Sequence, residues 1–137
     1  MQDLIKIFIY LFKRYSPLRI FQIIEANKVW IKGKSLEFGA FKDRERNFSA
    51  HLKGEKNFEY TNLKKDKKNN ILEGDLNRRL KFRSNHYENI IIFNVLEHLS
   101  NPTKSLKELN RILKKDGLLI GSTPFLYQVH GAPNDYL

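Results

Sequence analysis

The chain has 137 residues, a length that predicts a single domain of ordinary size. Hydrophobic residues make up 41% of the chain and charged residues 29%, a balance that excludes a fibrous or wholly disordered protein. Cysteine is absent, which excludes disulfide bonds, thiolate metal sites and a cysteine nucleophile.

The net charge of +10 is unevenly distributed along the chain. Residues 85–137 carry equal numbers of acidic and basic side chains, so the whole positive excess lies in residues 1–84. A positive field can attract nucleic acid, anionic lipid or a phosphorylated substrate, although scattered lysines can equally serve solubility. The most basic loop, 64–70, contains no aromatic side chain of the kind that nucleic-acid readers place among basic residues. We therefore expect no specific nucleic-acid binding, and only a salt-sensitive association with nucleic acid or anionic lipid through the lysines of this loop, Lys64, Lys65, Lys67 and Lys68.

The first residues of the chain predict two helices. Residues 3–15 read as a helix with an apolar surface and basic flanks, which packs on the domain or, alternatively, lies on a membrane face. Its apolar stretch is too short to span a bilayer and lacks the pattern of a signal peptide, so we expect no transmembrane segment and a cytoplasmic location. Ser16 then caps a second helix with Pro17 at its first position, and Gly33 marks the end of that helix.

Short apolar runs after Gly33 predict a series of strands. They lie at residues 35–38, 58–63, 70–73, 89–95 and 118–122. The run at 89–95 is β-branched and uncharged, as expected for a central strand that is covered on both faces. We therefore predict an α/β domain in residues 34–137, preceded by a helical segment in residues 1–33.

A helix is predicted between the last two strands. Asn101 is a good cap and Pro102 suits the first helical position. Lys114 and Lys115 fall in the expected last turn, where cations favour the helix dipole, and Gly117 ends the helix. A strand, a helix and a strand in this order form a parallel crossover. The predicted fold is an open, mainly parallel, Rossmann-like sheet with helices on both faces.

The first candidate for a ligand site follows the first predicted strand, because open parallel sheets bind ligands beyond the carboxyl ends of their strands. Glu37 and Gly39 lie at this point, where a glycine lets the backbone approach a ligand closely. The four histidines lie far apart in the sequence, so no metal site is predicted. A phosphate-binding loop is also excluded, because no glycine-rich run precedes a Lys-Ser or Lys-Thr pair.

The second half of the chain carries more specific motifs. These are Leu96-Glu97-His98, Asn101-Pro102, Arg111-Ile112-Leu113-Lys114, Asp116-Gly117 and Ser122-Thr123-Pro124-Phe125. Together they resemble the class I S-adenosylmethionine-dependent methyltransferases, in the branch called methyltransferase type 11. The resemblance runs from about residue 35 to the end of the chain.

The resemblance implies roles at five positions. Glu37 takes the place of the acid near the methionine ammonium of S-adenosylmethionine, and Gly39 that of the first glycine of the motif. Asp75 and Leu76 match the pair that binds adenine through a carboxylate and the next backbone N–H. Asn94 matches the strand end that lines the methyl-donor pocket.

The implied function is methyl transfer from S-adenosylmethionine to a small molecule or a glycan precursor. The glycan assignment comes from the closing stretch, 130–136, which looks like a variant seen among proteins of sugar and surface-glycan biosynthesis. An acceptor hydroxyl needs a base, and His98 is the candidate because histidines exchange protons near neutral pH. A structural role for His98 at the start of the next helix is an equal alternative. His130 and Asp135 are further candidates for the base.

Three departures from the family pattern motivate an alternative, a methyltransferase-like binding or scaffold protein without catalytic activity. Phe41 and Asp43 replace two glycines of the motif. The acid expected to bind the ribose aligns with about Lys64, which has the wrong charge for an acceptor. The family also continues for two further strands and a helix. The strand at 118–122 is therefore expected to be an apolar edge through which the chain self-associates.

Overall fold

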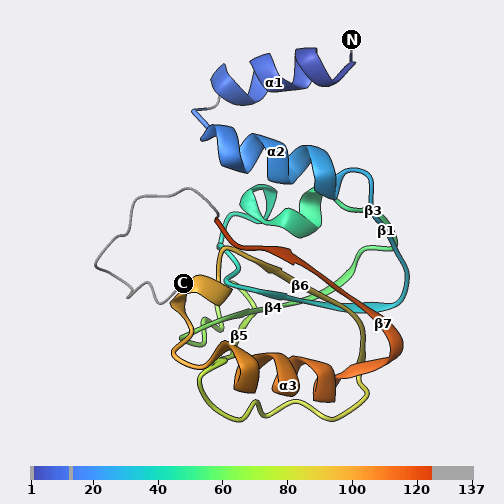
Figure 1. Ribbon diagram of the computed structural model, residues 1–137, viewed down its shortest axis with the longest axis vertical. Coiled ribbons are helices and arrows are strands. Elements are labelled where there is room, and N and C mark those ends of the chain that lie inside the picture. The colour runs from blue at the N-terminus through green and yellow to red at the C-terminus, as the bar shows by residue number, and fades with distance from the viewer. Residues whose placement is uncertain (1, 13, 125–137) are drawn as a thin grey trace.

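The computed structural model describes residues 2–12 and 14–124, and its centre is a five-stranded parallel sheet (Figure 1). The strand order is β5-β4-β2-β6-β7, and every neighbouring pair is parallel. The strands are β2 (Lys34–Phe38), β4 (Asn57–Asn62), β5 (Ile71–Glu73), β6 (Tyr87–Phe93) and β7 (Leu113–Ser122). The predicted fold class and the five predicted strands are confirmed.

The interior strand β6 separates two hydrophobic cores. Because successive side chains of a strand point to opposite faces, Ile90 and Ile92 enter one core and Ile91 enters the other. All three side chains are buried. The uncharged β-branched run therefore occupies a position that is covered on both faces, as the sequence predicts.

Helix α3 (Pro102–Ile112) covers one face of the sheet (Figure 1). Its cap is Asn101, whose side-chain oxygen accepts a hydrogen bond of 2.9 Å from the backbone N–H of Lys104. The prediction that this helix continues to Gly117 is wrong, and Lys114 and Lys115 belong to β7.

The early end of α3 has a tertiary cause. The backbone N–H groups of Asn85 and His86 donate to the carbonyl oxygens of Arg111 and Ile112, the last two residues of the helix. The next residue, Leu113, pairs with Tyr87 and begins β7. Strand pairing with β6 therefore takes over from the helix before the glycine is reached.

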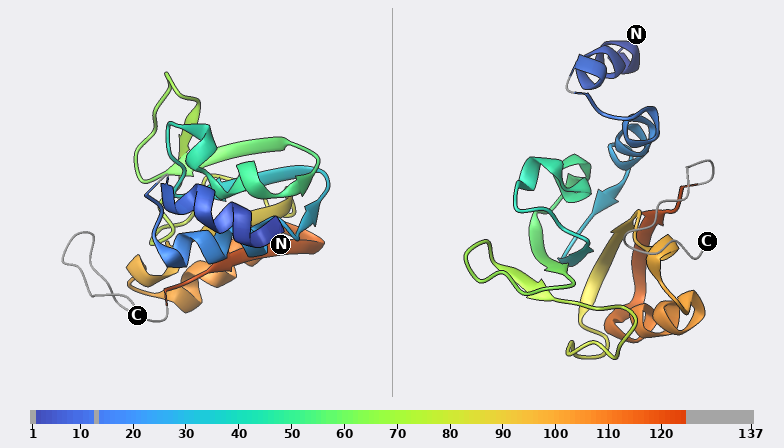
Figure 2. Two further views of the ribbon diagram at one scale, coloured as in Figure 1. Left: turned by 90° about the horizontal axis from the view of Figure 1, so that it is seen from above. Right: turned by 90° about the vertical axis from the view of Figure 1, so that its left-hand side faces the viewer.

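The opposite face is covered by elements that precede β4 in the chain. They are α2 (Pro17–Ala26) and two 3₁₀ helices, η1 (Arg44–Arg46) and η2 (Phe48–His51), and in Figure 2 they lie on the side of the sheet away from α3. Helix α1 (Gln2–Phe12) packs on α2, farther from the sheet. Ile23 and Ala26 of α2 pack with Phe48 and Ile91 in the core of this face. Ser16 caps α2, as predicted, and its hydroxyl oxygen accepts from the backbone N–H of Arg19.

Helix α2 ends at Ala26, so the prediction that it reaches Gly33 is wrong. Strand β1 (Trp30–Ile31) follows it and pairs in parallel with β3 (Lys53–Gly54) in a separate two-stranded sheet. This pairing takes the chain away from the helical path and leads it into β2. No helix in the described part of the chain is long and apolar enough to cross a membrane.

Candidate functional site

The carboxyl ends of β2, β4 and β6 surround a cavity of about 360 Å³, which we call the strand-end cavity. Its walls are mostly apolar, with amide groups and one imidazole. They comprise Phe38, Gly39, Asn62, Leu63, Gly74, Leu76, Asn77, Asn94, Val95, His98 and Leu99. Four of the six residues predicted for the site, Gly39, Leu76, Asn94 and His98, therefore lie around one space.

Gly39 stands where β2 leaves the sheet and where a side chain has no room. Its φ is +71°, a conformation that residues with a Cβ rarely adopt. A Cβ built on Gly39 would also lie 2.9 Å from Cγ2 of Val95 on the neighbouring strand end. The glycine thus brings two strand ends together and leaves backbone exposed to the strand-end cavity.

Glu37 lies beneath the loop and does not line the cavity. Its buried carboxylate accepts hydrogen bonds from the backbone N–H groups of Phe48, at 2.8 Å, and Ser49, at 3.2 Å. Burial raises the pKa of this carboxyl, and the hydrogen bonds oppose that shift. Its contacts hold η2 against the end of β2, whereas its predicted role near the methionine ammonium stays a prediction.

Phe41 does not enter the strand-end cavity, because the loop after β2 turns away from it. The backbone N–H of Phe41 donates to Oδ1 of Asn47 at 2.7 Å, and Nδ2 of Asn47 donates back to the Phe41 carbonyl at 3.3 Å. Asn47 is buried and so fixes the loop. Sequence analysis missed Asn47, whose only signal is an amide between two short helical turns.

Asn94 connects the end of β6 to helix α2. Its φ of +55° lies in the left-handed region, which asparagine tolerates better than most residues. Nε2 of Gln22 donates to Oδ1 of Asn94 and to Oγ of Ser122, each at 2.7 Å. Nδ2 of Asn94 donates back to Oε1 of Gln22 at 3.2 Å. Sequence analysis missed Gln22, although a glutamine beside the apolar positions of α2 is a signal for a buried polar contact.

The two residues predicted to bind adenine are placed differently. Leu76 is buried and lines the strand-end cavity. Asp75 is outside the lining: its carboxylate accepts from the backbone N–H of Asn77 at 2.9 Å and lies 3.4 Å from Nε of Arg78. The Asp75 carboxylate is therefore engaged by its own turn.

Asn62 is the last residue of β4 and the side chain that this strand end presents to the cavity. The alignment of the ribose-binding acid with about Lys64 stays a prediction. Nδ2 of Asn62 donates to the Ala40 carbonyl at 3.0 Å, and Oδ1 accepts from the backbone N–H of Leu63 at 2.7 Å. An amide oxygen has two lone pairs, so Oδ1 can accept one further hydrogen bond.

His98 belongs to a short 3₁₀ helix, η3 (Leu96–His98), at the mouth of the strand-end cavity. Nε2 of His98 lies 4.0 Å from Oε1 of Glu97, whose carboxylate is buried. The cap of the following helix is Asn101, so His98 is not that cap. The imidazole therefore combines a place on the cavity wall with a nearby carboxylate.

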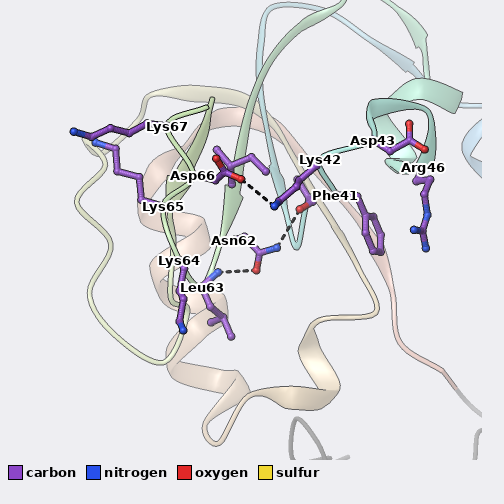
Figure 3. Close-up of a pocket in the computed structure, with 12 residues that line it drawn as sticks. Phe41, Lys42, Asp43, Arg46, Asn62, Leu63, Lys64, Lys65, Asp66 and Lys67 are labelled. Carbon is purple, nitrogen blue, oxygen red and sulfur yellow. Dashed lines mark hydrogen bonds and ion pairs between the residues drawn. The ribbon is translucent and has the colours of Figure 1, made fainter. Parts of the chain in front are cut away.

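A second, wider cavity of about 880 Å³ adjoins the first, and we call it the basic cavity (Figure 3). The two cavities share Asn62 and Leu63. Five cations and two acids line the basic cavity: Lys42, Arg46, Lys64, Lys65, Lys67, Asp43 and Asp66. Each acid is engaged, because Lys42 lies 3.6 Å from Asp66 and Asp43 caps η1. The guanidinium of Arg46 lies over the ring of Phe41, 4.5 Å from its centre.

Among the described residues, no three His, Asp or Glu side chains are grouped so that they could hold a metal ion.

Comparison with known families identifies the fold. The family model of the methyltransferase domain matches residues 51–121, just over half of the chain. The chain belongs to the class I S-adenosylmethionine-dependent methyltransferase family. No curated protein sequence matches it.

Solved methyltransferase structures share the fold. A SAM-dependent methyltransferase from Thermotoga maritima is 20% identical with a TM-score of 0.56, and the match covers 88% of this chain and 60% of that one. The trans-methyltransferase CalH, in complex with SAH, is 16% identical with a TM-score of 0.51 over 77% of this chain and 34% of CalH. The [4+2]-cyclase SpnF is 14% identical with a TM-score of 0.50, over 71% and 40%. The methyltransferase chain described here thus spans 60% or less of these three proteins.

S-adenosylmethionine is the cofactor of this methyltransferase family, and the strand-end cavity fits it. An adenosyl group needs apolar walls with a few polar groups, and the cavity supplies Leu76 and Val95 together with three asparagines. Gly39 leaves open a space that any side chain would fill. The residues of this cavity that could hold the cofactor are Gly39, Asn62, Leu76 and Asn94. His130 and Asp135, the further candidates for the base, lie outside the described residues.

Proposed function

We propose that this methyltransferase domain transfers a methyl group from S-adenosylmethionine to a small molecule or a glycan precursor. One observation carries the proposal. The strand-end cavity lies where open parallel sheets bind ligands, and four of the residues predicted from the sequence for the site line it. The small-molecule acceptor is supported by the motifs of the family branch.

The protein's contribution to such a reaction is mainly positioning. When bound, the cofactor supplies a methyl group that is already strongly electrophilic, so correct placement of the acceptor provides much of the acceleration. Gly39 and Asn94 fix the floor of the site through their close contacts. The imidazole of His98 would accept the proton of an acceptor hydroxyl, and the Glu97 carboxylate would stabilise the resulting positive charge.

The basic cavity supports an acceptor that carries negative charge. It adjoins the strand-end cavity through Asn62 and Leu63, and its cations outnumber its acids. A phosphate or carboxylate on the acceptor would be attracted by this excess and oriented by Arg46, whose guanidinium can form paired hydrogen bonds. We therefore favour phosphorylated or acidic sugars among the glycan precursors.

The test is the transfer of a labelled methyl group to sugar phosphates and to the corresponding neutral sugars. We expect transfer to the phosphorylated acceptors. His98→Asn should lower turnover by about 10²–10⁴-fold while leaving the binding of S-adenosylmethionine unchanged. His86→Asn is the matched control, because His86 lies at the opposite end of the sheet and should leave turnover unchanged.

A second candidate function is a binding or scaffold protein that keeps the fold without methyl transfer. It is favoured by Asp75, whose carboxylate is already engaged by Arg78, and by Lys64, which lies at about the position where the family pattern has an acid. An absence of saturable binding at millimolar S-adenosylmethionine would favour this second function and contradict the first.

A further inference from the structure

Helix α1 carries a row of apolar side chains that face solvent. Ile5, Phe8, Ile9 and Phe12 are 58%, 64%, 50% and 89% exposed. Their spacing of three and four residues places them on one side of the helix. We call these four residues the apolar ridge. Single exposed apolar residues are common on protein surfaces, but a continuous row marks an interaction site.

The opposite side of α1 is already attached to the domain. The ring of Tyr10 stacks on Tyr15 with 5.7 Å between centres and meets the edge of His51 at 6.1 Å. Tyr10 also packs against the core that α2 shares with the sheet. Figure 1 shows α1 at the end of the molecule, beyond α2 and remote from the sheet. The domain therefore fixes one side of α1 and leaves the apolar ridge uncovered.

Charge indicates which kind of surface the ridge would meet. The first 24 residues of the sequence contain one acid, Asp3, and four basic residues, Lys6, Lys13, Arg14 and Arg19. The whole chain carries a net charge of +10. Two copies that met through this end would bring like charges together, whereas an anionic lipid surface would attract them.

We propose that α1 binds the surface of anionic membranes, with the apolar ridge among the lipid headgroups. An eleven-residue helix is too short to cross a bilayer, so it lies along the surface. Phenylalanine side chains supply the buried apolar area, and basic residues supply the attraction to anionic lipid. Surface binding of this kind places the domain at a membrane without a spanning segment.

The test is co-sedimentation of the full chain with vesicles of phosphatidylcholine, with and without phosphatidylserine. We expect binding to the anionic vesicles that weakens in high salt. The double variant Phe8→Asp/Phe12→Asp should weaken binding by about tenfold or more, because charged side chains would replace two buried rings. Far-UV circular dichroism should be unchanged, since both side chains are exposed in the folded chain.

The matched control is Trp30→Asp/Leu106→Asp, which removes two exposed apolar side chains outside α1 and outside the linings of both named cavities, and adds the same charge. We expect this control to bind anionic vesicles as the unmodified chain does. Equal loss in both double variants would show that charge alone directs the association and would overturn the proposal. So would sedimentation equilibrium showing a dimer that Phe8→Asp/Phe12→Asp dissociates, because the ridge would then bind a second copy. Both double variants should bind the cofactor as the unmodified chain does, so failure of the membrane proposal can be told apart from failure of the proposed reaction.

Discussion

The two ends of the central sheet are built in opposite ways. At the amino ends of the strands, charged groups meet one another: Nζ of Lys34 lies 2.8 Å from Oε1 of Glu59 and 2.8 Å from Nε2 of His86. The hydroxyl of Tyr87 donates to Oε2 of Glu59 at 2.6 Å. At the carboxyl ends, polar side chains such as Asn94 and His98 line cavities instead.

A second cluster completes the amino end. Oε2 of Glu88 accepts from the backbone N–H of Lys34 at 2.7 Å, and Oε1 accepts from Nζ of Lys114. The hydrogen bond from Lys114 lowers the pKa of Glu88. Here each named polar group has its partner in the fold, so this end stabilises the sheet. At the other end, Oδ1 of Asn62 can accept one further hydrogen bond from a ligand. We therefore propose that the amino end of the sheet stabilises the fold and that the carboxyl end binds the ligand.

The largest effect on stability is expected at Glu37, whose contacts support both the fold and the loop beside the strand-end cavity. Glu37→Ala leaves two buried backbone N–H groups without an acceptor, so the free energy of unfolding should fall by about 3 kcal/mol. Cofactor affinity should fall as well, because η2 supports the loop after Gly39. Glu37→Gln keeps one acceptor oxygen and is the milder control. Urea denaturation measures the first effect, and equal stability of the Ala variant and the unmodified chain would contradict it.

Acid should destabilise the folded chain through the contacts of Glu59 at the amino end of the sheet. Burial alone would raise the pKa of Glu59, but the hydrogen bonds from Lys34 and Tyr87 lower it overall below its ordinary 4.5. A carboxyl whose pKa is lowered by folding stabilises the folded state above its ordinary pKa, and this contribution is lost as the pH falls below about 4.5. We expect a loss of about 1 kcal/mol, because the group is partly solvated.

The variants Glu59→Gln and Tyr87→Phe test whether the acid sensitivity of the fold comes from the Glu59 carboxyl. Both should flatten the acid side of the stability–pH profile measured by thermal unfolding. A profile that keeps its slope in both variants would place the acid sensitivity elsewhere in the molecule.

A smaller effect, on the association state of the chain, is expected from changes at the β7 edge of the sheet. Within the described residues, β7 pairs only with β6, and Leu118 and Leu119 are exposed on it. We propose that the chain self-associates through this edge, because unpaired strand edges template pairing. Leu119→Lys should shift sedimentation profiles toward the monomer. A chain that is already monomeric at roughly tens of micromolar would contradict this prediction.

Much of the fold could be predicted because its signals are local. The β-branched run around Ile91 predicts a buried strand, and Asn101 with Pro102 predicts the start of α3. The end of α3 could not be predicted, because the pairing of Leu113 with Tyr87 decides it. Strands β1 and β3 were not predicted, because each has only two residues and so shows no periodic pattern of apolar side chains.

Family motifs predicted several residues that the structure brings together, whereas their roles in binding and catalysis stay predictions. Gly39, Leu76, Asn94 and His98 lie around one cavity, since motifs at strand ends converge in a parallel sheet. The contacts of Gln22 and Asn47 cross between distant segments and leave little trace in the sequence. Spacing identifies which strand ends meet, but only three-dimensional contacts show which polar groups are already engaged.

The most direct test compares two glycines at opposite ends of β2. Gly39 and Gly33 have φ values of +71° and +76°, and a Cβ on either would lie within 3 Å of a neighbouring side chain. Gly39→Ala and Gly33→Ala should therefore cost similar stability, about 1–2 kcal/mol. In calorimetric titration with S-adenosylhomocysteine, we predict that Gly39→Ala binds about tenfold more weakly while Gly33→Ala binds like the unmodified chain. Equal weakening in both variants, or none in Gly39→Ala, would contradict the assignment of binding to the carboxyl end of the sheet.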